Sequence, residues 1–223
     1  MRGILLDIEG TTTSISFVYD VLFPFARKHL NTYVPTTDLT NLKQEYDEDL
    51  RRGLEPPAWE GGAVRYVEWL MDQDRKSTAL KKLQGEIWRA GYENGALHGE
   101  VFPDVPPALE RWHRQNIDVR IFSSGSILAQ RMIFSTTKAG DLTRFINGYF
   151  DTTTGPKTEA SSYQQIANEF NLAAGDVVFV SDVTRELDAA RSAGMKTLLC
   201  VRAGNHRQPA HTHTIIATFD GLN

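Results

Sequence analysis

The stretch GILLDIEGTTT, residues 3–13, decides the fold of this chain. Its apolar residues, Ile4 to Leu6, run directly into Asp7, and a second acid follows at Glu9 before a glycine and three threonines. A short apolar run that ends in polar residues is typical of a buried strand in a parallel sheet. Ligands of such sheets bind beyond the carboxyl ends of the strands. The stretch therefore predicts a buried strand that presents two carboxylates to a ligand.

Apolar runs of the same kind recur later in the chain. They are Val119 to Phe122, Val177 to Val180 and Thr197 to Val201, and a last strand is expected near Ile215 to Phe219. Helical patterns lie between the later runs, as in βαβ units. The expected helices are Ser126 to Phe134, Ser161 to Phe170 and Arg185 to Ala193. We therefore predict an α/β fold with a Rossmann-like, three-layer core around a parallel sheet.

The segment between the first two runs has a different pattern. From residue 19 to about residue 90, apolar residues recur at helical spacing, with Leu80, Leu83 and Ile87 on one face, and no strand pattern stands out. We therefore predict an α-helical cap domain inserted into the core. The expected division is residues 1–12 and 102–223 for the catalytic core and residues 13–101 for the cap.

Composition narrows the class of protein. The chain has 223 residues, of which 41% are hydrophobic and 23% charged, and its formal net charge is -4, which is the balance of a soluble globular protein. Without a block of Lys and Arg, neither nucleic acid nor an anionic membrane is an expected partner. Cys200 is the only cysteine and lies in an apolar run, which indicates a buried thiol in a reducing compartment. With no signal peptide or membrane span evident, we expect the chain in the cytoplasm.

Polar residues follow three of the predicted strands, at Asp7 and Glu9, at Ser123 and Ser124, and at Asp182. Because parallel strands end at one edge of a sheet, these side chains are expected to meet there. Two carboxylates from separate strands form a hard oxygen site that suits Mg²⁺, which also binds water and phosphate oxygens. The sequence therefore predicts a magnesium site beside Asp7.

The same edge has the groups that phosphoryl transfer needs. The two serines and the amide of Gly125 can donate hydrogen bonds to phosphate oxygens, and Lys157 adds a positive charge. An aspartate such as Asp7 can attack phosphorus, and a second acid such as Glu9 can protonate the leaving oxygen. A phosphate ester is therefore the expected substrate class.

Structural roles are the alternative for each of these residues. Asp7 to Gly10 taken alone is more typical of a turn than of a catalytic site. Ser123 or Ser124 can cap the helix that starts near Ser126, and we expect at least one of them to do so while also binding phosphate. Lys157, judged without its neighbours in other motifs, is more typical of a solvated lysine.

Two alternatives concern the second half of the chain. Asp182 can serve as the N-cap of the following helix, with Glu186 as a charge in its first turn. His206, His211 and His213 resemble a metal cluster by composition, but they lie in a tail with Pro and Gly and no Cys. We therefore expect a solvated loop there rather than a zinc site.

Four stretches resemble, in order, the four motifs of the phosphatases of the haloacid dehalogenase superfamily. They are LLDIEGTT (5–12), FSSGS (122–126), GPKTEASSY (155–163) and VFVSDVTRE (178–186). That superfamily usually has a second Asp where this chain has Glu9. This departure, together with MDQDRKSTALKKLQGEIWRAGY (71–92), resembles the enolase-phosphatase branch, the acireductone synthases of methionine salvage. The likeness extends from residue 2 to about residue 205.

The resemblance implies a substrate and a cofactor. The substrate would be 2,3-diketo-5-methylthiopentyl-1-phosphate, which is enolised and then dephosphorylated to 1,2-dihydroxy-3-keto-5-methylthiopentene in one site with Mg²⁺. The implied metal ligands are Asp7, Glu9 and Asp182, and Glu186 would lie beside them and act through water. Phe17 and Trp88 are candidates to face the methylthio group. The chain is expected to act as a monomer on this small molecule.

Rival functions differ in what happens to the phosphoryl group. The nearest rival is a magnesium-dependent phosphatase of another small ester, without an enolase step. A phospho-accepting signalling module uses similar residues but needs neither a cap nor a general acid such as Glu9. A dehalogenase that needs no metal is a third possibility, which Glu9 also disfavours.

Overall fold

The computed structural model describes residues 1–73, 75 and 77–222, and these fall into two compact units. One unit comprises Met1–Val18 and the described residues from His98 onward, and the other is Tyr19–Leu97. The helical unit is thus shorter than the predicted insertion of residues 13–101. Its flanks join the first unit because the hydroxyl of Thr13 donates to the Glu100 carbonyl at 2.7 Å and the Phe102 N–H donates to the Thr12 carbonyl at 2.9 Å.

The first unit is built on a parallel sheet. In the described part of the chain this sheet has six strands, in the order β3-β2-β1-β4-β5-β6. They are β1 (Gly3–Leu6), β2 (Asp118–Phe122), β3 (Gly148–Phe150), β4 (Val177–Ser181), β5 (Lys196–Cys200) and β6 (Thr214–Ile216). β1 lies inside the sheet, with Leu6 in register with Ile121 of β2 and Val180 of β4. The strand that ends in Asp7 therefore has a neighbour on each side.

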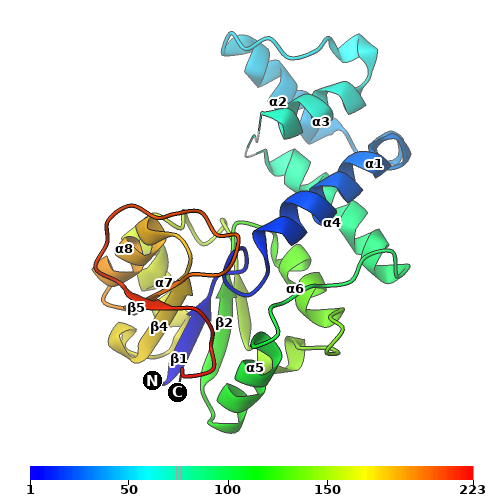
Figure 1. The fold of residues 1–223 in the computed structure, drawn as a ribbon. Coiled ribbons are helices and arrows are strands. Elements are labelled where there is room, and N and C mark those ends of the chain that lie inside the picture. Colours follow the sequence, from blue (N-terminus) through cyan, green and yellow to red (C-terminus); the bar gives the residue numbers. More distant parts are fainter. Residues whose placement is uncertain (74, 76, 223) are drawn as a thin grey trace. The chain divides into compact units, whose positions relative to one another are not determined.

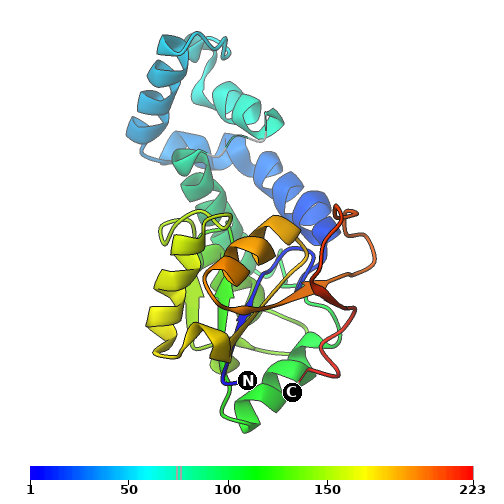
Figure 2. The same ribbon diagram turned by 90° about the vertical axis from the view of Figure 1, so that its left-hand side faces the viewer.

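Helices cover both faces of the sheet, with α7 and α8 on one face and α5 and α6 on the other (Figures 1 and 2). These helices are α5 (Val105–Arg114), α6 (Ile127–Ser135), α7 (Ala160–Phe170) and α8 (Thr184–Ser192), with short 3-10 turns η4 (Thr143–Phe145) and η5 (Ala174–Asp176). α7 and α8 pack on the side chains of Leu5, Phe122 and Phe179. Burial on both faces explains why β1 and β4, which are buried along their whole length, are almost wholly apolar. The predicted three-layer α/β core is confirmed.

Three elements of this unit differ from the sequence prediction. β3 was not predicted, because it has three half-buried residues and lacks a run of apolar side chains. α5 was also not predicted, because Pro106 and Pro107 at its start obscure the helical pattern. Proline fits the first turn of a helix, where the missing N–H has no partner within the helix. The last strand is displaced by a few residues, so that Phe219 follows β6 and packs against Trp112 of α5.

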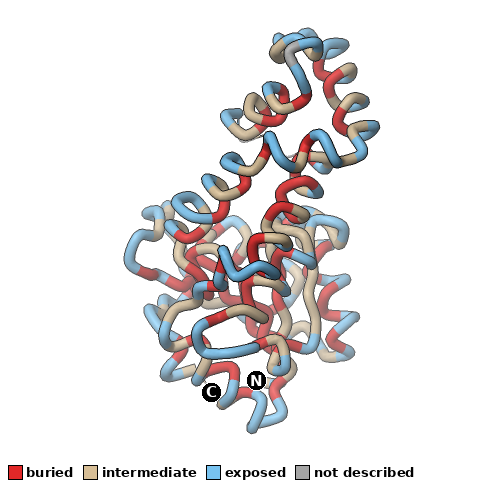
Figure 3. The backbone as a smooth tube through the Cα atoms, turned by 90° about the vertical axis from the view of Figure 1, so that its right-hand side faces the viewer, coloured by how far each residue is buried: buried red, intermediate tan, exposed pale blue. Residues whose placement is uncertain are grey.

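The second unit is helical, as predicted, and has a core of its own. Its elements are η1 (Phe17–Leu22, a π-helix that begins in the first unit), α1 (Phe23–Tyr33), η2 (Val34–Thr36), α2 (Thr40–Arg51), η3 (Trp59–Gly61), α3 (Ala63–Asp72) and α4 (Thr78–Glu93). Buried and exposed residues alternate along these helices (Figure 3). The buried side chains include Leu30 of α1, Tyr66 and Leu70 of α3, and Ile87 of α4. These contacts join α4, the last α-helix of the unit, to α1, the first, as well as to the helices between them.

Two further observations bear on the expectations from composition. Across residues 1–73, 75 and 77–222, no helix has both the length and the hydropathy that crossing a membrane requires. Cys200 is buried at the end of β5, as predicted, and burial raises the pKa of its thiol to about 11.

Candidate active site

Asp7 lies at the carboxyl end of β1 and is held by backbone groups. Its N–H donates to the Val180 carbonyl at 3.0 Å, and its carboxylate accepts the N–H of Ile8 at 2.7 Å. The chain then turns sharply, because the N–H groups of residues 11–13 all point to the Ile8 carbonyl at 2.9 to 3.2 Å. Asp7 is 4% exposed. The turn therefore fixes the carboxylate at the edge of the sheet.

Lys157 pairs with two carboxylates beneath this edge. Its Nζ lies 2.6 Å from Asp7 Oδ1 and 2.7 Å from Glu186 Oε2, and the lysine is 8% exposed. Burial alone would lower the pKa of Lys157, but the charges of Asp7 and Glu186 outweigh it and raise that pKa. The lysine is therefore charged at neutral pH. The alternative of a solvated lysine is wrong, because its loop folds the side chain under the end of β1.

Ser181 joins the same cluster and was not singled out from the sequence. Its Oγ lies 3.3 Å from Asp7 Oδ2 and 3.0 Å from Glu186 Oε2, and it accepts the N–H of Val183 at 3.1 Å. One hydroxyl proton serves one of the two carboxylates at a time. Burial raises the pKa of Glu186 despite its pairing with Lys157. The sequence signal for Ser181 was its place directly before Asp182.

Asp182 is buried next to these acids. Burial raises its pKa to about 7, with further contributions from the charges of Asp7 and Glu186 and a smaller one from Glu9. The alternative that Asp182 caps the following helix is wrong, because Val183 occupies the N-cap position of α8. The N–H of Thr184 is bonded instead by Gln208 Oε1 at 3.1 Å. The Asp182 carboxylate therefore remains available to the site.

The loop after β2 has Ser123, Ser124 and Gly125 at the same edge of the sheet. The Gly125 N–H donates to Ser123 Oγ over a long 3.3 Å, and Ser124 is exposed. The expectation that one of these serines caps the next helix is wrong, because Ser126 caps α6 by accepting the N–H of Ala129. A serine three residues before the capped N–H makes that bond, and the earlier serines lie too far from it. Their hydroxyls are left for other ligands.

Glu9 lies within the turn that follows Asp7. It is partly buried, and its backbone forms a β-bridge with Thr13. Burial and the charges of Asp7 and Glu186 are the largest causes that raise the pKa of Asp182, and the charge of Glu9 is a smaller one. Glu9 and Asp182 therefore interact electrostatically. The predicted residues of β1, β4 and the loop of Lys157 are thus brought together.

The donor set at this edge fits a small hard cation. Asp7 and Asp182 are buried acids whose mutual repulsion raises the pKa of Asp182 after the effect of burial, and a bound cation would relieve that repulsion. Among the described residues, no three acidic, His or Cys side chains converge into a complete ligand set. Mg²⁺, the predicted ion, is held by one or two carboxylates and completes its coordination with water and substrate oxygens.

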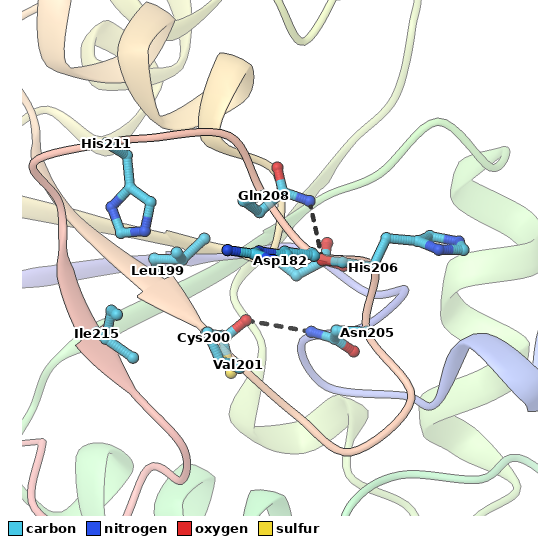
Figure 4. A pocket seen from close by; sticks show the side chains of 10 residues that line it. Asp182, Leu199, Cys200, Val201, Asn205, His206, Gln208, His211 and Ile215 are labelled. Atoms are coloured by element: carbon cyan, nitrogen blue, oxygen red, sulfur yellow. Dashed lines mark hydrogen bonds between the residues drawn. The ribbon is translucent and has the colours of Figure 1, made fainter.

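The three histidines of the tail do not behave as one solvated loop, so that expectation is wrong for His213. His213 is 6% exposed, and its ring lies 2.9 Å from Thr197 Oγ1 and 3.0 Å from Asp188 Oδ1. The reason is that Thr197 on β5 and Asp188 on α8 supply polar partners next to β6. His206 is exposed, and it lies on the opposite side of a pocket from His211 (Figure 4).

That pocket adjoins Asp182 and has a volume of about 350 Å³. The end of β5 and the connection from β5 to β6 form its wall, with Cys200, Asn205 and Gln208 among the lining residues (Figure 4). It lies away from Lys157 and from the loop after β2. Of the residues predicted for the site, it includes Asp182.

The metal-free protein is expected to lose stability as the pH rises. Between the ordinary pKa of 3.8 and the folded value of about 7, the folded state keeps a proton on Asp182 that the unfolded chain has released. Stability therefore falls as pH rises through this window and levels off above it.

Because Mg²⁺ would offset this charge repulsion, its stabilising effect should be larger at about pH 7.5 than at about pH 5.5. Thermal unfolding followed by circular dichroism, with and without Mg²⁺, measures both effects. In Asp182→Asn the difference between the two pH values should shrink. An equal effect of Mg²⁺ at both pH values in the unaltered chain would contradict the prediction.

Comparisons with known proteins agree with this geometry. A family model described as haloacid dehalogenase-like hydrolase matches residues 1–194. The protein named Enolase-phosphatase E1 from Synechococcus elongatus is 46% identical to this chain, over 98% of the chain and 96% of that protein. The protein of the same name from Klebsiella pneumoniae is 44% identical, over 100% and 97% of the two.

Solved structures give the same picture. The crystal structure of the UTR4 protein from Saccharomyces cerevisiae matches with a TM-score of 0.81 and 33% identity, over 99% of each chain. The structure of CbbY from Rhodobacter sphaeroides in complex with phosphate matches with a TM-score of 0.63 over 100% of this chain and 96% of that one. At 16% identity the second likeness concerns the fold alone.

Proposed function

Because the chain belongs to the haloacid dehalogenase-like hydrolases and, among them, to the enolase-phosphatase E1 proteins, we propose that it enolises and then dephosphorylates a diketone phosphate. The proposed substrate is 2,3-diketo-5-methylthiopentyl-1-phosphate, and the product is 1,2-dihydroxy-3-keto-5-methylthiopentene with inorganic phosphate. One observation carries this proposal more than any other: the buried contact of 2.6 Å between Lys157 and Asp7 at the end of the central strand. It holds the Asp7 carboxylate at one point beside a positive charge.

Asp7 is the proposed nucleophile. A carboxylate oxygen attacks phosphorus, the bond from phosphorus to the ester oxygen breaks, and an aspartyl phosphate forms. Glu9, two residues on in the same turn, gives its proton to the leaving oxygen. It then takes a proton from the water that attacks the aspartyl phosphate, which returns both acids to their starting states.

The phosphoryl group is held by donors from two loops. Ser123, Ser124 and the N–H of Gly125 can bond its oxygens from the end of β2, since the long bond between Gly125 and Ser123 is readily exchanged for a phosphate oxygen. Lys157 approaches from the loop before α7 and neutralises charge that builds up on the oxygens. Its contact with Glu186 keeps the ammonium group in place between turnovers.

Mg²⁺ is the proposed cofactor, held by the carboxylates of Asp7 and Asp182 with Glu9 beside them. When bound, it would neutralise charge on the phosphoryl group and polarise the substrate carbonyl. Glu186 contacts Lys157 and Ser181, so it would act on that ion through these neighbours rather than as a direct ligand. This arrangement accounts for acids that would otherwise repel one another at the edge of the sheet.

Enolisation removes a proton from the carbon that bears the phosphate ester, a C=C bond forms as the neighbouring C=O double bond breaks, and that carbonyl oxygen takes up a proton to give the enol. The same carbon is attached to the oxygen that Glu9 protonates later. A glutamate has one more methylene than an aspartate, so its carboxyl group reaches further from the backbone. This length suits a group that works on the substrate carbon as well as on the ester oxygen.

The experiment that tests the function follows the two steps separately. The diketone phosphate is added with Mg²⁺, and absorbance of the enol and release of phosphate are recorded in parallel. Enol formation that precedes phosphate release supports the proposal. Phosphate release from simple esters with no enol from the diketone would identify a plain phosphatase, and a lasting phosphorylated protein without turnover would identify a signalling module.

Replacing Glu9 with glutamine should slow phosphate release by about a hundredfold or more, the usual effect of losing a positioned proton donor. The test is steady-state phosphate release under saturating substrate and Mg²⁺. If Glu9 also takes the enolisation proton, enol formation falls by a similar factor; if it does not, the phosphorylated enol accumulates. Glu9→Asp is the matched control for reach, and wild-type rates of both steps in that variant would show that the length of the side chain is incidental.

The helical unit is proposed to act as a cap on the substrate during turnover. Support comes from its place in the chain, since it is inserted between β1, which ends at Asp7, and β2, which ends before Ser123. Excluding water would favour transfer to Asp7 over loss of the enol to side reactions. Its apolar side chains are the proposed partners of the methylthio end.

A further inference from the structure

The turn after Asp7 is held from the far side by the connection between β5 and β6. Asn205 donates from Nδ2 to the Gly10 carbonyl at 2.9 Å. Arg202 donates from Nε and Nη2 to the Thr11 carbonyl at 3.2 and 3.1 Å. Two side chains three residues apart thus bind consecutive carbonyls of the turn that contains Glu9. We call this pair of side chains, Arg202 and Asn205, the carbonyl clamp.

Arg202 is itself firmly anchored. Its guanidinium group makes two hydrogen bonds to the Asp104 carboxylate, at 2.8 and 2.9 Å, and a third to the Ala217 carbonyl at 2.8 Å. It lies between the rings of Phe102 and Phe219, with centroids at 4.5 and 4.8 Å. Planar bidentate pairing of this kind restricts the side chain to one position. Arg202 is therefore a fixed support for the turn.

Asn205 sits where the turn passes closest to Asp182. Gly10 has a φ of +69°, and a Cβ added there would lie 2.3 Å from Asp182 Oδ2 and 3.1 Å from Asn205 Oδ1. The peptide of Gly10 is therefore packed directly against the Asp182 carboxylate, with Asn205 beside both. Asn205 Nδ2 also donates to the Cys200 carbonyl at 3.2 Å, which ties it to β5 (Figure 4).

We propose that Asn205 is a positioning residue that, with Arg202, sets the spacing between Gly10 and Asp182 and so tunes the metal site. The importance of this spacing for catalysis rests on the proposed function, whereas its expected effect on metal affinity can be measured without substrate. Asp7 and Glu9 on one side of this spacing repel Asp182 on the other. If the hydrogen bonds of the carbonyl clamp are lost, the turn moves away from Asp182. Partners that orient ligands in this way affect metal binding by about 10- to 100-fold.

The clamp does not touch the groups proposed to bind phosphate. Lys157 and the loop after β2 are held by contacts of their own, to Asp7, to Glu186 and to Phe150. Loss of the Asn205 amide should therefore weaken metal binding and leave phosphate binding at saturating metal unchanged. A purely structural role would instead lower the melting temperature and weaken both.

The test compares Asn205→Leu with the unaltered chain. Leucine has nearly the same size and shape but cannot donate to Gly10. Mn²⁺, which takes the same oxygen ligands as Mg²⁺, is titrated without substrate and its free fraction is read by electron paramagnetic resonance. We expect Mn²⁺ to bind about 10-fold more weakly. Inhibition by inorganic phosphate, measured at saturating Mg²⁺, should keep its constant.

His206→Ala is the matched control. His206 follows Asn205 in the same connection, is exposed, and lies on the outer side of the pocket (Figure 4). It should bind Mn²⁺ as the unaltered chain does. Asn205→Ser, which leaves a shorter polar side chain, provides a second variant if the leucine variant fails to fold.

Mn²⁺ affinity equal to that of the unaltered chain in a folded Asn205 variant would overturn the inference, as would an equal loss in His206→Ala. Equal weakening of Mn²⁺ and phosphate binding would also overturn it, in favour of a structural role. Failure of the proposed function gives a different result, because the unaltered chain would then bind Mn²⁺ normally but form no enol from the diketone phosphate.

Discussion

Replacing Asp7 with asparagine is expected to abolish phosphate release, with a fall in kcat on the order of 10⁴-fold or more. An amide nitrogen or oxygen is a poor nucleophile towards phosphorus, and it is a weaker ligand for Mg²⁺ than a carboxylate. The fold should survive, since asparagine has the shape of aspartate and its amide oxygen can still accept hydrogen bonds from Ile8 and Lys157 at 2.7 and 2.6 Å.

The measurement is single-turnover phosphate release, together with acid quenching and mass analysis of the peptide that contains residue 7. The unaltered chain should show a transient phosphorylated peptide, and Asp7→Asn should show none. Asp176→Asn is the matched control, because Asp176 lies at the opposite end of β4 and pairs only loosely with Arg2, at 3.9 Å. Substantial turnover by a folded Asp7→Asn protein would remove Asp7 from the role of nucleophile.

Lys157→Met should be the most damaging change at the site for stability and should also slow turnover strongly. Removing the ammonium group leaves Asp7 and Glu186 buried without a cation, and breaking a buried pair in this way costs about 3–5 kcal/mol. Loss of one charged group that stabilises the transition state costs about 10²- to 10³-fold in kcat. Added Mg²⁺ should recover part of the stability, because it supplies positive charge near Asp7.

Urea unfolding measures the first effect and steady-state phosphate release the second. Lys43→Met is the control, because Lys43 pairs with Asp47 one helical turn away on the half-exposed surface of α2. Such surface pairs contribute about 0.3–0.5 kcal/mol. If Lys157→Met unfolded at the same urea concentration as Lys43→Met, the buried pairing could not be what organises the site.

The sequence predicted the parts of the fold that rest on strong local patterns. β1, β2, β4 and β5 follow from apolar runs that end in polar residues, and the insertion follows from a change to helical spacing. The three-residue strand β3 and the helix α5, which begins with two prolines, were not predicted, because packing against neighbouring elements stabilises them rather than a local sequence pattern. His213 was placed in solvent because its partners, on β5 and α8, are distant in the chain.

The positions of site residues that directly follow a strand could be predicted from the sequence. The positions of site residues in longer loops could be predicted much less well. Asp7 and Asp182 follow their strands directly, so their convergence comes from the topology. The burial of Lys157 depends on a loop whose path is not indicated by any hydrophobic periodicity. The role of Arg202 and Asn205 was not predicted from the sequence. Both side chains bind backbone carbonyls of another segment, and every residue has such a carbonyl whatever its type.

The interior position of β1 has a consequence for how the protein is made. β1 is made before its partners β2 and β4, which begin only at Asp118 and Val177. Tyr19–Leu97, in contrast, is one continuous segment with a core of its own, so it can pack before β4 has been made. β1 gains its second neighbouring strand only when β4 has been made. The reactive centre can therefore form only after the chain has been made as far as β4, because Asp182 follows that strand.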